Sequence, residues 1–244
     1  MPTFATGLKS AIGPLAALTA PLPLPPPDGA VLQDVYDAET AYLRAMRDGR
    51  AGPRWYAWCP HLSLSVSRRE AGLLGDMGAF AAEPVAIRQT GGTAVPQGPG
   101  TLNVSVFLRR PGPPAIRETY AALVAALAEG FAAIGVKTTV GARPGSFCDG
   151  EFNLLHAGRK LVGTAQRWAA DGDGGSLCLM HCAVLTGGDP ARLCARTEAL
   201  YHACGLERRY DPDAHSGLAI DRAALEQALT APLDRLTGGR TFPA

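Results

Sequence analysis

Residues 146–168 read SFCDGEFNLLHAGRKLVGTAQRW. Two short apolar runs, residues 152–155 and 161–162, flank a Gly-Arg-Lys turn, and this pattern predicts a β-hairpin. Cys148 lies just before the first predicted strand and Lys160 begins the second, so the hairpin can bring these two residues together. An ammonium group fixed next to a cysteine favours the thiolate, which is the nucleophilic form. Cys148 and Lys160 are therefore predicted to form a catalytic pair.

Each member of this pair has a structural alternative. Free cysteine is among the most buried residue types, so Cys148 can also be interpreted as a core residue. Its flanking residues, however, are turn formers rather than core formers, namely Gly145, Ser146, Asp149 and Gly150. The structural alternative for Lys160 is an exposed residue of the Gly-Arg-Lys turn.

The composition is that of a globular protein with one substantial core. The chain has 244 residues, of which 47% are hydrophobic and 18% charged, and its mean hydropathy is +0.04. A net charge of +1 argues against a nucleic acid or an anionic membrane as partner. Proline or charged residues interrupt every apolar stretch before 18 residues, so no transmembrane helix is predicted. Residues 1–27 are interpreted as a disordered Ala/Pro-rich leader and residues 28–244 as a single domain in the cytoplasm.

The six cysteines do not show the spacing of a disulfide framework and are interpreted as free thiols in a reducing compartment. Cys178, His181 and Cys182 have the residue types of a metal site. The surrounding residues 177–185 alternate as a strand, which places His181 on the face opposite both cysteines. A tetrahedral site needs its ligands together, so no metal site is predicted.

Helical and strand periodicities are interspersed along the chain. The predicted helices span residues 31–49, 113–134 and 189–204, with a short one after Asp221. The predicted strands outside the hairpin span residues 55–58, 62–66, 84–89, 102–108, 136–140 and 177–185. This order predicts an α+β domain with a mostly antiparallel, mixed central sheet and flanking helices.

A second informative stretch, residues 88–100, reads RQTGGTAVPQGPG. Paired glycines after a strand let the backbone approach a ligand and direct free N–H groups at it, and Arg88 adds a positive charge. The stretch lacks the Gly-Lys-Ser/Thr of a P-loop. A ligand-binding loop and an ordinary hairpin turn with a bulge are equal interpretations of this spacing.

These two stretches together resemble a known family. RQTGGTAV is similar to the Arg-x-x-Gly-Gly-x-Ala-Val loop of the biotin/lipoate protein ligase superfamily, and GRKLVGTAQR resembles the Gly-Arg-Lys-(apolar)-x-Gly-Ser/Thr-Ala-Gln motif of its lipoate branch. The resemblance extends over residues 31–220. Within that branch, SFCDGEFNL is similar to the segment that carries the nucleophile of cysteine-dependent octanoyltransferases. Residues 28–244 are therefore expected to adopt the catalytic-domain fold of this superfamily.

The resemblance implies that Cys148 is the nucleophile and that Lys160 contacts the acyl carbonyl. It implies transfer of an octanoyl or lipoyl group through a cysteine thioester to a lysine of a lipoyl-carrier domain, with no required cofactor. That carrier is a glycine-cleavage H protein or a 2-oxoacid dehydrogenase E2 subunit, and acyl carrier protein is one donor. For Thr164 and Gln166, ordinary sheet polarity is an equal alternative to substrate binding. The implied substrate-binding residues are Arg88, Gly91, Gly92, Thr93, Ala94, Val95, Asn153, Gly163, Thr164, Ala165 and Gln166.

Other parts of the expected site follow from the chemistry of acyl transfer. Backbone N–H groups of residues 163–165, or of the loop at residues 91–92, are expected to form an oxyanion hole. The acyl chain needs an apolar tunnel, for which the sheet face and the stripe of the helix at residues 116–134 are expected to serve. His156 has the residue type of a general base, but a solvated histidine at a strand end is the favoured interpretation.

Two positions depart from the ATP-dependent ligases of the family. Gln97 stands where those ligases usually have a histidine, and Asn153 stands where they usually have an aspartate. These departures, and the absence of an expected accessory domain after residue 220, favour a transferase. A ligase that uses ATP and Mg²⁺ to form a lipoyl-adenylate is the first alternative, and a non-catalytic acyl- or carrier-binding protein is the second. The sequence leaves open the donor, the acyl chain, the carrier and the oligomeric state.

Overall fold

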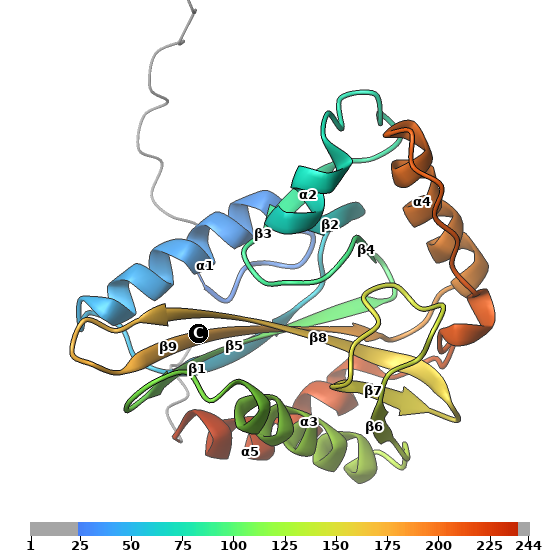
Figure 1. The fold of residues 1–244 in the computed structure, drawn as a ribbon. Coiled ribbons are helices and arrows are strands. Elements are labelled where there is room, and N and C mark those ends of the chain that lie inside the picture. The colour runs from blue at the N-terminus through green and yellow to red at the C-terminus, as the bar shows by residue number, and fades with distance from the viewer. Residues whose placement is uncertain (1–23, 239–244) are drawn as a thin grey trace, which may run out of the picture.

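The computed structural model describes residues 24–238, so most of the predicted leader, residues 1–23, lies outside the described part of the chain. Figure 1 shows its helices and strands. In chain order they are α1 (Leu32–Arg47), β1 (Arg54–Trp58), β2 (Ser63–Ser67), α2 (Arg68–Leu74), β3 (Val85–Arg88), β4 (Val95–Gln97), β5 (Thr101–Arg110), α3 (Ile116–Ala133), β6 (Thr139–Gly141), β7 (Asn153–His156), β8 (Arg159–Ala170), β9 (Ser176–Leu185), α4 (Pro190–Ala203), a 3₁₀ turn (Pro212–Ala214) and α5 (Arg222–Thr237). No helix of this part is long and apolar enough to cross a bilayer.

The larger sheet has six strands in the order β1-β5-β9-β8-β7-β6, and every neighbouring pair is antiparallel. The predicted hairpin is confirmed as β7 and β8, in which His156 pairs with Arg159. The two residues between them, Ala157 and Gly158, both have positive φ, at 49° and 75°. A two-residue turn of this kind matches the twist of the strands that it joins.

The smaller sheet has three strands in the order β3-β2-β4, with β2 parallel to β3 and antiparallel to β4. Strands β3 and β4 do not pair with each other, so the glycine-rich residues between them are not a hairpin turn. They cross from one side of β2 to the other. The α+β class with antiparallel and mixed sheets is therefore confirmed, although β1 and β2, which are consecutive in sequence, belong to different sheets.

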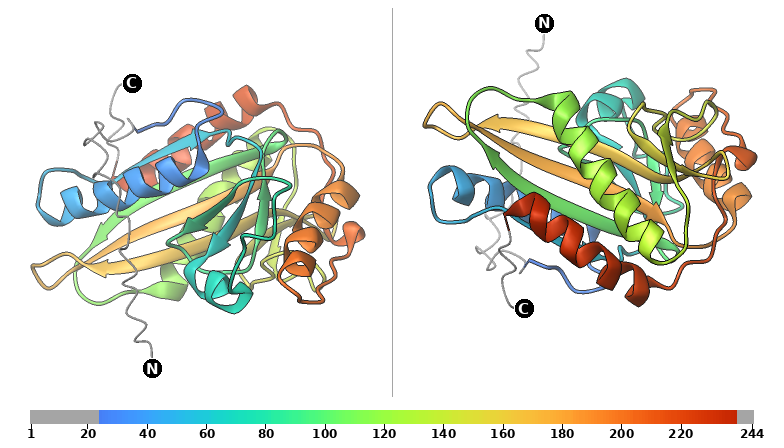
Figure 2. Two further views of the ribbon diagram at one scale, coloured as in Figure 1. Left: turned by 90° about the horizontal axis from the view of Figure 1, so that it is seen from above. Right: turned by 90° about the horizontal axis from the view of Figure 1, so that it is seen from below.

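The two faces of the larger sheet are covered differently (Figures 1 and 2). Helices α3 and α5 pack on one face, and α1 and the smaller sheet lie over the other. Side-chain alternation along β5 and β9 separates the environments: Cys178 and Cys182 are buried on the helix side, whereas His181 bonds Glu39 of α1. The prediction that His181 faces away from the two cysteines is confirmed.

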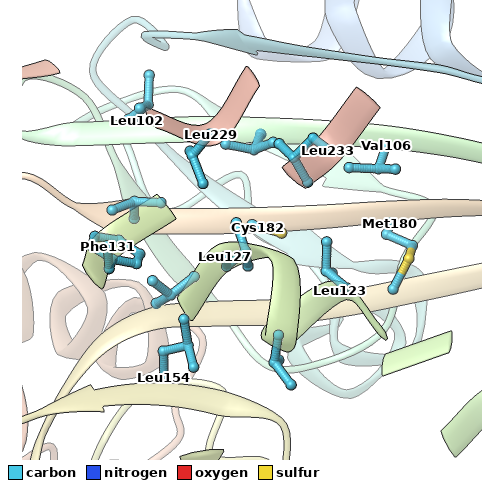
Figure 3. Close-up of a cluster of buried hydrophobic side chains, with 14 of the residues drawn as sticks. Leu102, Val106, Leu123, Leu127, Phe131, Leu154, Met180, Cys182, Leu229 and Leu233 are labelled. Atoms are coloured by element: carbon cyan, nitrogen blue, oxygen red, sulfur yellow. The ribbon is translucent and has the colours of Figure 1, made fainter. Parts of the chain in front are cut away.

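A leucine-rich core fills the space between the larger sheet and its two helices (Figure 3). Leu123, Leu127 and Phe131 of α3 and Leu229 of α5 are fully buried there. Helix α5 begins at the N-cap Asp221, as predicted, but it is 16 residues long rather than short. The apolar stripe of α3 is thus used for the core beneath the sheet.

Candidate active site

A cavity lies on the other face of the larger sheet, between that sheet and the smaller one. Cys148 and Lys160 both line it, and Gly163 of β8 and Ala183 of β9 contribute small residues to its wall. The sheet face that was expected to hold an apolar tunnel therefore has a cavity. The expectation that α3 contributes to the tunnel is wrong, because its stripe packs on the opposite face of the sheet.

The Cys148 side chain is fitted into the glycine-rich loop. Cys148 has φ of 51°, a left-handed conformation that is unfavourable for a residue with a side chain. Its backbone N–H donates a hydrogen bond to Thr93 Oγ1 at 2.9 Å. A Cβ placed on Gly92, whose φ is 99°, would lie 2.1 Å from Cys148 Sγ. The thiol therefore occupies space that only a glycine at position 92 leaves free.

Lys160 is buried directly beneath the Cys148 loop, with 4% of its surface exposed. Its Nζ donates hydrogen bonds to the carbonyl oxygens of Phe147 (2.6 Å) and Cys148 (2.7 Å). Burial lowers the Lys160 pKa to about 8, and negative charge on Cys148 and Asp149 opposes this shift. The hairpin thus brings Lys160 to Cys148, and the ammonium is fixed by the backbone carbonyls of Phe147 and Cys148.

Arg88 holds the glycine-rich loop in place through hydrogen bonds to backbone carbonyl oxygens. Its guanidinium is 4% exposed and donates to the carbonyl oxygens of Ser65 (2.7 Å), Gly91 (2.8 Å) and Thr93 (2.7 Å). The loop carbonyls consequently point towards Arg88. The backbone N–H groups of Gly92 and Thr93 make no hydrogen bond with any residue in the range 24–238. Of the other loop residues, Val95 lines the cavity.

Asn153 and Thr164 brace the loop through hydrogen bonds, and Thr164 also lines the cavity. Asn153, 1% exposed, donates to the Cys148 carbonyl oxygen (3.4 Å) and accepts from the Thr164 N–H (3.3 Å). The Thr164 hydroxyl donates to the Phe152 carbonyl oxygen at 2.6 Å. The Thr164 N–H is therefore engaged, which leaves the glycine-rich loop as the better source of oxyanion donors.

Three of the residues considered from the sequence lie outside the cavity. Gln166 points to the helix side of β8, donates to the Ile116 carbonyl oxygen at 3.1 Å and does not line the cavity, which favours the alternative of ordinary sheet polarity. The Ala94 N–H faces Tyr201 Oη of α4, at 3.3 Å. His156 sits at the end of β7 against the Lys137 carbonyl oxygen (2.9 Å), which confirms the strand-end interpretation.

One residue that supports the site has no signal in the sequence. His215 is fully buried, accepts a hydrogen bond from the Phe147 N–H through Nε2 (3.1 Å) and donates from Nδ1 to the Asp211 carbonyl oxygen (3.0 Å). Its ring stacks on Phe147 with 3.8 Å between centroids. Burial lowers the His215 pKa to about 4, which keeps the imidazole neutral. Next to it, the Ser216 N–H donates to the Lys160 carbonyl oxygen (2.8 Å).

A buried polar cluster lies near one side of the cavity. Glu39 of α1 is fully buried and accepts hydrogen bonds from Ser105 Oγ (2.6 Å), Tyr56 Oη (2.7 Å) and His181 Nε2 (2.7 Å). Burial acts to raise the Glu39 pKa, but His181 and the hydroxyl donors outweigh it and hold the pKa below its ordinary value. The sequence contained part of this signal, because Ser105 is a polar residue within a predicted strand in which every second residue is apolar.

All six cysteines are free thiols. Within residues 24–238, no group of three or more His, Cys, Asp or Glu side chains is arranged to hold a metal ion. The fold and the site thus define a class of protein: an α+β domain that has a cysteine and a buried lysine beside a cavity between its two sheets.

The family model described as the lipoyl protein ligase A/B catalytic domain matches residues 80–207. The chain belongs to this family. An uncharacterized protein of Cupriavidus necator is 34% identical to it over 88% of this chain and 95% of that protein. An octanoyl-[GcvH]:protein N-octanoyltransferase of Kyrpidia tusciae is 40% identical, but the match covers only 35% of this chain and 30% of that enzyme.

Solved structures share the fold at low sequence identity. Lipoate-protein ligase A bound with ATP superposes with a TM-score of 0.58 at 19% identity, over 80% of this chain and 78% of that one. A bi-partite lipoate protein ligase from Thermoplasma acidophilum, studied with its E2 lipoyl domain, has a TM-score of 0.55 at 18% identity, over 81% and 77% of the two chains. The expected catalytic-domain fold of the lipoate branch is confirmed, and the chain is an enzyme of a family that includes ligases and octanoyltransferases.

Proposed function

We propose that the protein is a cysteine-dependent acyltransferase that moves an octanoyl or lipoyl group through a Cys148 thioester to the lysine of a lipoyl-carrier domain. The observation that carries this proposal is the fit of the Cys148 thiol against Gly92, in a left-handed backbone conformation, directly above the buried ammonium of Lys160. Unfavourable backbone conformations of this kind persist where the surrounding structure holds a functional group in place. A cysteine with only a packing role would not need this arrangement.

The reaction has two steps. In the first, Cys148 sulfur bonds to the carbonyl carbon of a donor thioester, the donor C–S bond breaks, and the donor leaves as a thiol after taking up a proton. In the second, the ε-amine of the carrier lysine attacks the Cys148 thioester. An amide forms, the second C–S bond breaks, and the amine proton passes to solvent or to the departing sulfur. Neither step consumes ATP, so the proposal requires no cofactor.

Two groups around the sulfur can stabilise the tetrahedral intermediates. The free N–H groups of Gly92 and Thr93 lie in the loop that contacts Cys148 Sγ, and they suit a negatively charged oxygen. Lys160, which is buried beneath the Cys148 loop, adds a positive charge, and electrostatic interactions are stronger at a buried position than in water. Arg88 positions the loop and does not need to touch the substrate.

The proposed partners are lipoyl-carrier proteins, with a glycine-cleavage H protein or a 2-oxoacid dehydrogenase E2 subunit as acceptor and acyl carrier protein as one donor. The names of two similar proteins support this choice of partners. One is an octanoyl-[GcvH]:protein N-octanoyltransferase, and the other is a lipoate protein ligase that was studied with its E2 lipoyl domain. A free catalytic thiol among six unpaired cysteines suits a reducing compartment, so we place the reaction in the cytoplasm.

The test is mass spectrometry of the intact protein after incubation with octanoyl-acyl carrier protein in the absence of ATP. We expect wild type to gain one octanoyl group, and Cys148→Ala to gain none. Cys204→Ala is the matched control, because Cys204 is a partly exposed thiol away from the cavity, and it should acylate like wild type.

Two outcomes would contradict the transferase. If Cys148→Ala acquires the adduct as efficiently as wild type, the nucleophile has been assigned wrongly. If no variant acquires an adduct from the thioester, but octanoic acid with ATP and Mg²⁺ gives a bound acyl-adenylate, the protein is a ligase.

A further inference from the structure

The groups of the proposed acylation reaction lie on two different sheets. Cys148 precedes β7 and Lys160 is part of β8, both in the larger sheet. The free N–H groups of Gly92 and Thr93 lie between β3 and β4, in the smaller sheet. Gly91 and Gly92 are exposed, so burial does not fix this loop. The position of its N–H groups relative to the Cys148 sulfur therefore depends on contacts that bridge the two sheets.

Two consecutive side chains at the start of the loop bond strands of the larger sheet. Gln89 Oε1 accepts from Arg167 of β8, and both of these residues are partly exposed. Thr90 Oγ1 lies 3.0 Å from His181 Nδ1 of β9. Thr90 is 1% exposed and the His181 side chain is 14% exposed, so water competes little with this second bond. The Thr90–His181 bond is therefore the firmer of the two bridges.

Glu39 sets the direction of the Thr90–His181 bond. Glu39 Oε2 lies 2.7 Å from His181 Nε2, while Ser105 and Tyr56 both donate to Oε1. Burial acts to raise the Glu39 pKa, but His181 and the hydroxyl donors hold the pKa below its ordinary value, so Glu39 is a carboxylate that can only accept. The proton of the neutral imidazole is therefore on Nε2, which leaves Nδ1 to accept from the Thr90 hydroxyl.

The His181 ring is fixed from several sides. In the larger sheet His181 pairs with Ser105 of β5 and with Ala165 of β8. The Tyr36 ring stacks on the imidazole with 5.4 Å between centroids, and Glu39 bonds its Nε2. The imidazole is consequently a rigid acceptor that belongs to the larger sheet.

The bond to Thr90 anchors the first end of the segment that carries the free N–H groups. Thr90 directly precedes Gly91, and Thr93, at the second end, accepts from the Cys148 N–H through Oγ1. Arg88 bonds the carbonyl oxygens of Gly91 and Thr93 between these ends. Without the first anchor the glycine backbone has no side chain with which to hold its position beside the sulfur.

This network does more than pack α1 on the sheet. A buried ion pair is often no more stabilising than apolar side chains of the same volume. A fully satisfied polar network does, however, hold its members in one arrangement. Oxyanion donors need such an arrangement, because they act only when they are already aimed at the position where charge develops.

We propose that His181 is a positioning residue for the acylation of Cys148. Glu39 orients its imidazole, and the bond to Thr90 holds the free N–H groups of the glycine-rich loop where they meet the carbonyl oxygen of the thioester. His181 itself does not need to touch the sulfur or the reacting carbonyl. The inference rests on the proposed function for the identity of the reaction, but the anchoring of the loop is a property of the protein without substrate.

Two reactions of Cys148 separate the position of the loop from the reactivity of the thiol. Acylation by octanoyl-acyl carrier protein places negative charge on the carbonyl oxygen, whereas alkylation by iodoacetamide forms an S–C bond and releases iodide without an oxyanion. In Thr90→Val we expect acylation at saturating donor to be about 10- to 100-fold slower and alkylation to match wild type. The donor concentration that gives half of the maximal rate should not change, because Thr90 does not line the cavity.

Two further threonine variants control this experiment. Thr90→Ser retains the hydroxyl and should restore the wild-type rate of acylation. Thr230→Val is the matched control, because it makes the same change at an exposed position of α5 whose hydroxyl bonds its own helix, and it should match wild type in both reactions. Peptide mass spectrometry assigns each modification to Cys148.

A double-mutant cycle assigns the effect to His181. His181→Gln removes the imidazole but retains an amide N–H for Glu39, and it should slow acylation as Thr90→Val does. The two losses should not add in the double variant, because both remove the same bridge. Circular dichroism establishes that each variant is folded. Additive losses would mean that His181 does not act through Thr90 and would overturn the inference.

The anchoring itself is measured without substrate, from the ¹⁵N order parameters of the Gly92 and Thr93 amides. Rigid backbone gives values of about 0.85 and flexible backbone gives values below about 0.6. Wild type and Thr90→Ser should be in the rigid range, and Thr90→Val should be below it. Unchanged order in Thr90→Val overturns the inference.

The outcomes separate this inference from the proposed function. If wild type is not acylated by the thioester, the transferase is contradicted, and the order parameters alone decide whether the bridge anchors the loop. Acylation of Thr90→Val at the wild-type rate overturns the positioning role. An equal loss of acylation and alkylation also overturns it, because Thr90 would then support the thiol and not the N–H groups.

Discussion

At the scale of single residues, the arrangement of the site depends on Gly92, because this residue has no side chain. Cys148 Sγ lies in the position that a Cβ of residue 92 would occupy, 2.1 Å away. The same Cβ would lie 3.0 Å from Arg88 Nη2, which holds the loop carbonyls. Gly92 also has φ of 99°, which residues with a side chain rarely adopt. Both the thiol and the loop therefore depend on this glycine.

Gly92→Ala should accordingly remove acylation without unfolding the protein. The added methyl group must displace the Cys148 thiol or the loop, and displacement of reacting atoms by about 1 Å can reduce rates about 100-fold. Strain at positive φ should lower the free energy of unfolding by about 1–2 kcal/mol. The measurements are the rate of Cys148 acylation by mass spectrometry and the unfolding free energy in urea.

The control for this substitution is Gly150→Ala, two residues after Cys148. A Cβ on Gly150 would meet no atom within 4 Å, and Gly150 does not have positive φ. This variant should acylate at the wild-type rate. If Gly92→Ala also retains the wild-type rate, the close approach of Cys148 to the glycine-rich loop is not required for catalysis.

Some residues of the site could be predicted from the sequence, and others could not, for physical reasons. Lys160 was predicted to reach Cys148 because a hairpin fixes which of its residues are adjacent. For Gln166 the sequence left substrate binding and ordinary sheet polarity as equal alternatives, because the sequence motif does not show which face of β8 each residue occupies. Alternation from Gly163 and Ala165, which line the cavity, places Gln166 on the helix side.

At the scale of elements, the Cys148 loop is held by a segment that follows it by more than 60 positions. The 3₁₀ turn Pro212–Ala214 presents His215 to the Phe147 N–H, and the next residue, Ser216, bonds Lys160. Such long-range contacts cannot be predicted from local periodicity. His215 is a single histidine in a polar segment, so no repeating pattern indicates that it is buried. The sequence therefore predicted the hairpin but not the segment that supports its loop.

The role of His215 predicts a dependence of stability on pH. The pKa of His215 is about 4 in the folded protein, against 6.5 for an unperturbed histidine, so the unfolded chain binds more protons between these values. The contribution of neutral His215 to the free energy of unfolding should be fully present above pH 6.5. It should decrease by about 3 kcal/mol as the pH drops towards 4. Lys160 and Arg143 oppose the charged imidazole, whereas Asp211 favours it.

Urea unfolding at pH 7 and pH 4.5 measures this effect in matched variants. His215→Gln can still accept from the Phe147 N–H but does not titrate, so it should reduce the loss between the two pH values. His202→Gln is the control, because the His202 side chain is 84% exposed, and it should behave like wild type. An identical loss in wild type and His215→Gln would mean that His215 does not stay neutral in the fold.

At the scale of the whole molecule, the larger sheet separates a hydrophobic core from the cavity. Its lower face in Figure 1, covered by α3 and α5, packs on an apolar core (Figure 3). Its upper face borders the cavity that lies under the smaller sheet. The strands were predictable from alternation, but their distribution between two sheets was not, because pairing partners are set by packing at long range. For this reason the sequence correctly predicted a cavity on a sheet face. The expectation that α3 also lines it was wrong, because the smaller sheet covers that face.

This separation predicts that stability and acyl specificity respond to different substitutions. Leu127 of α3 is fully buried in the lower core, so Leu127→Ala should lower the free energy of unfolding by about 2–5 kcal/mol. Ala183 lies on the other face in the wall of the cavity, so Ala183→Val should reduce acylation by octanoyl thioesters much more than by butanoyl thioesters. Chain-length profiles of Cys148 acylation and urea unfolding test both variants. If Leu127→Ala alters the chain-length profile as strongly as Ala183→Val does, then the α3 face contributes to the acyl path and the two faces are not independent.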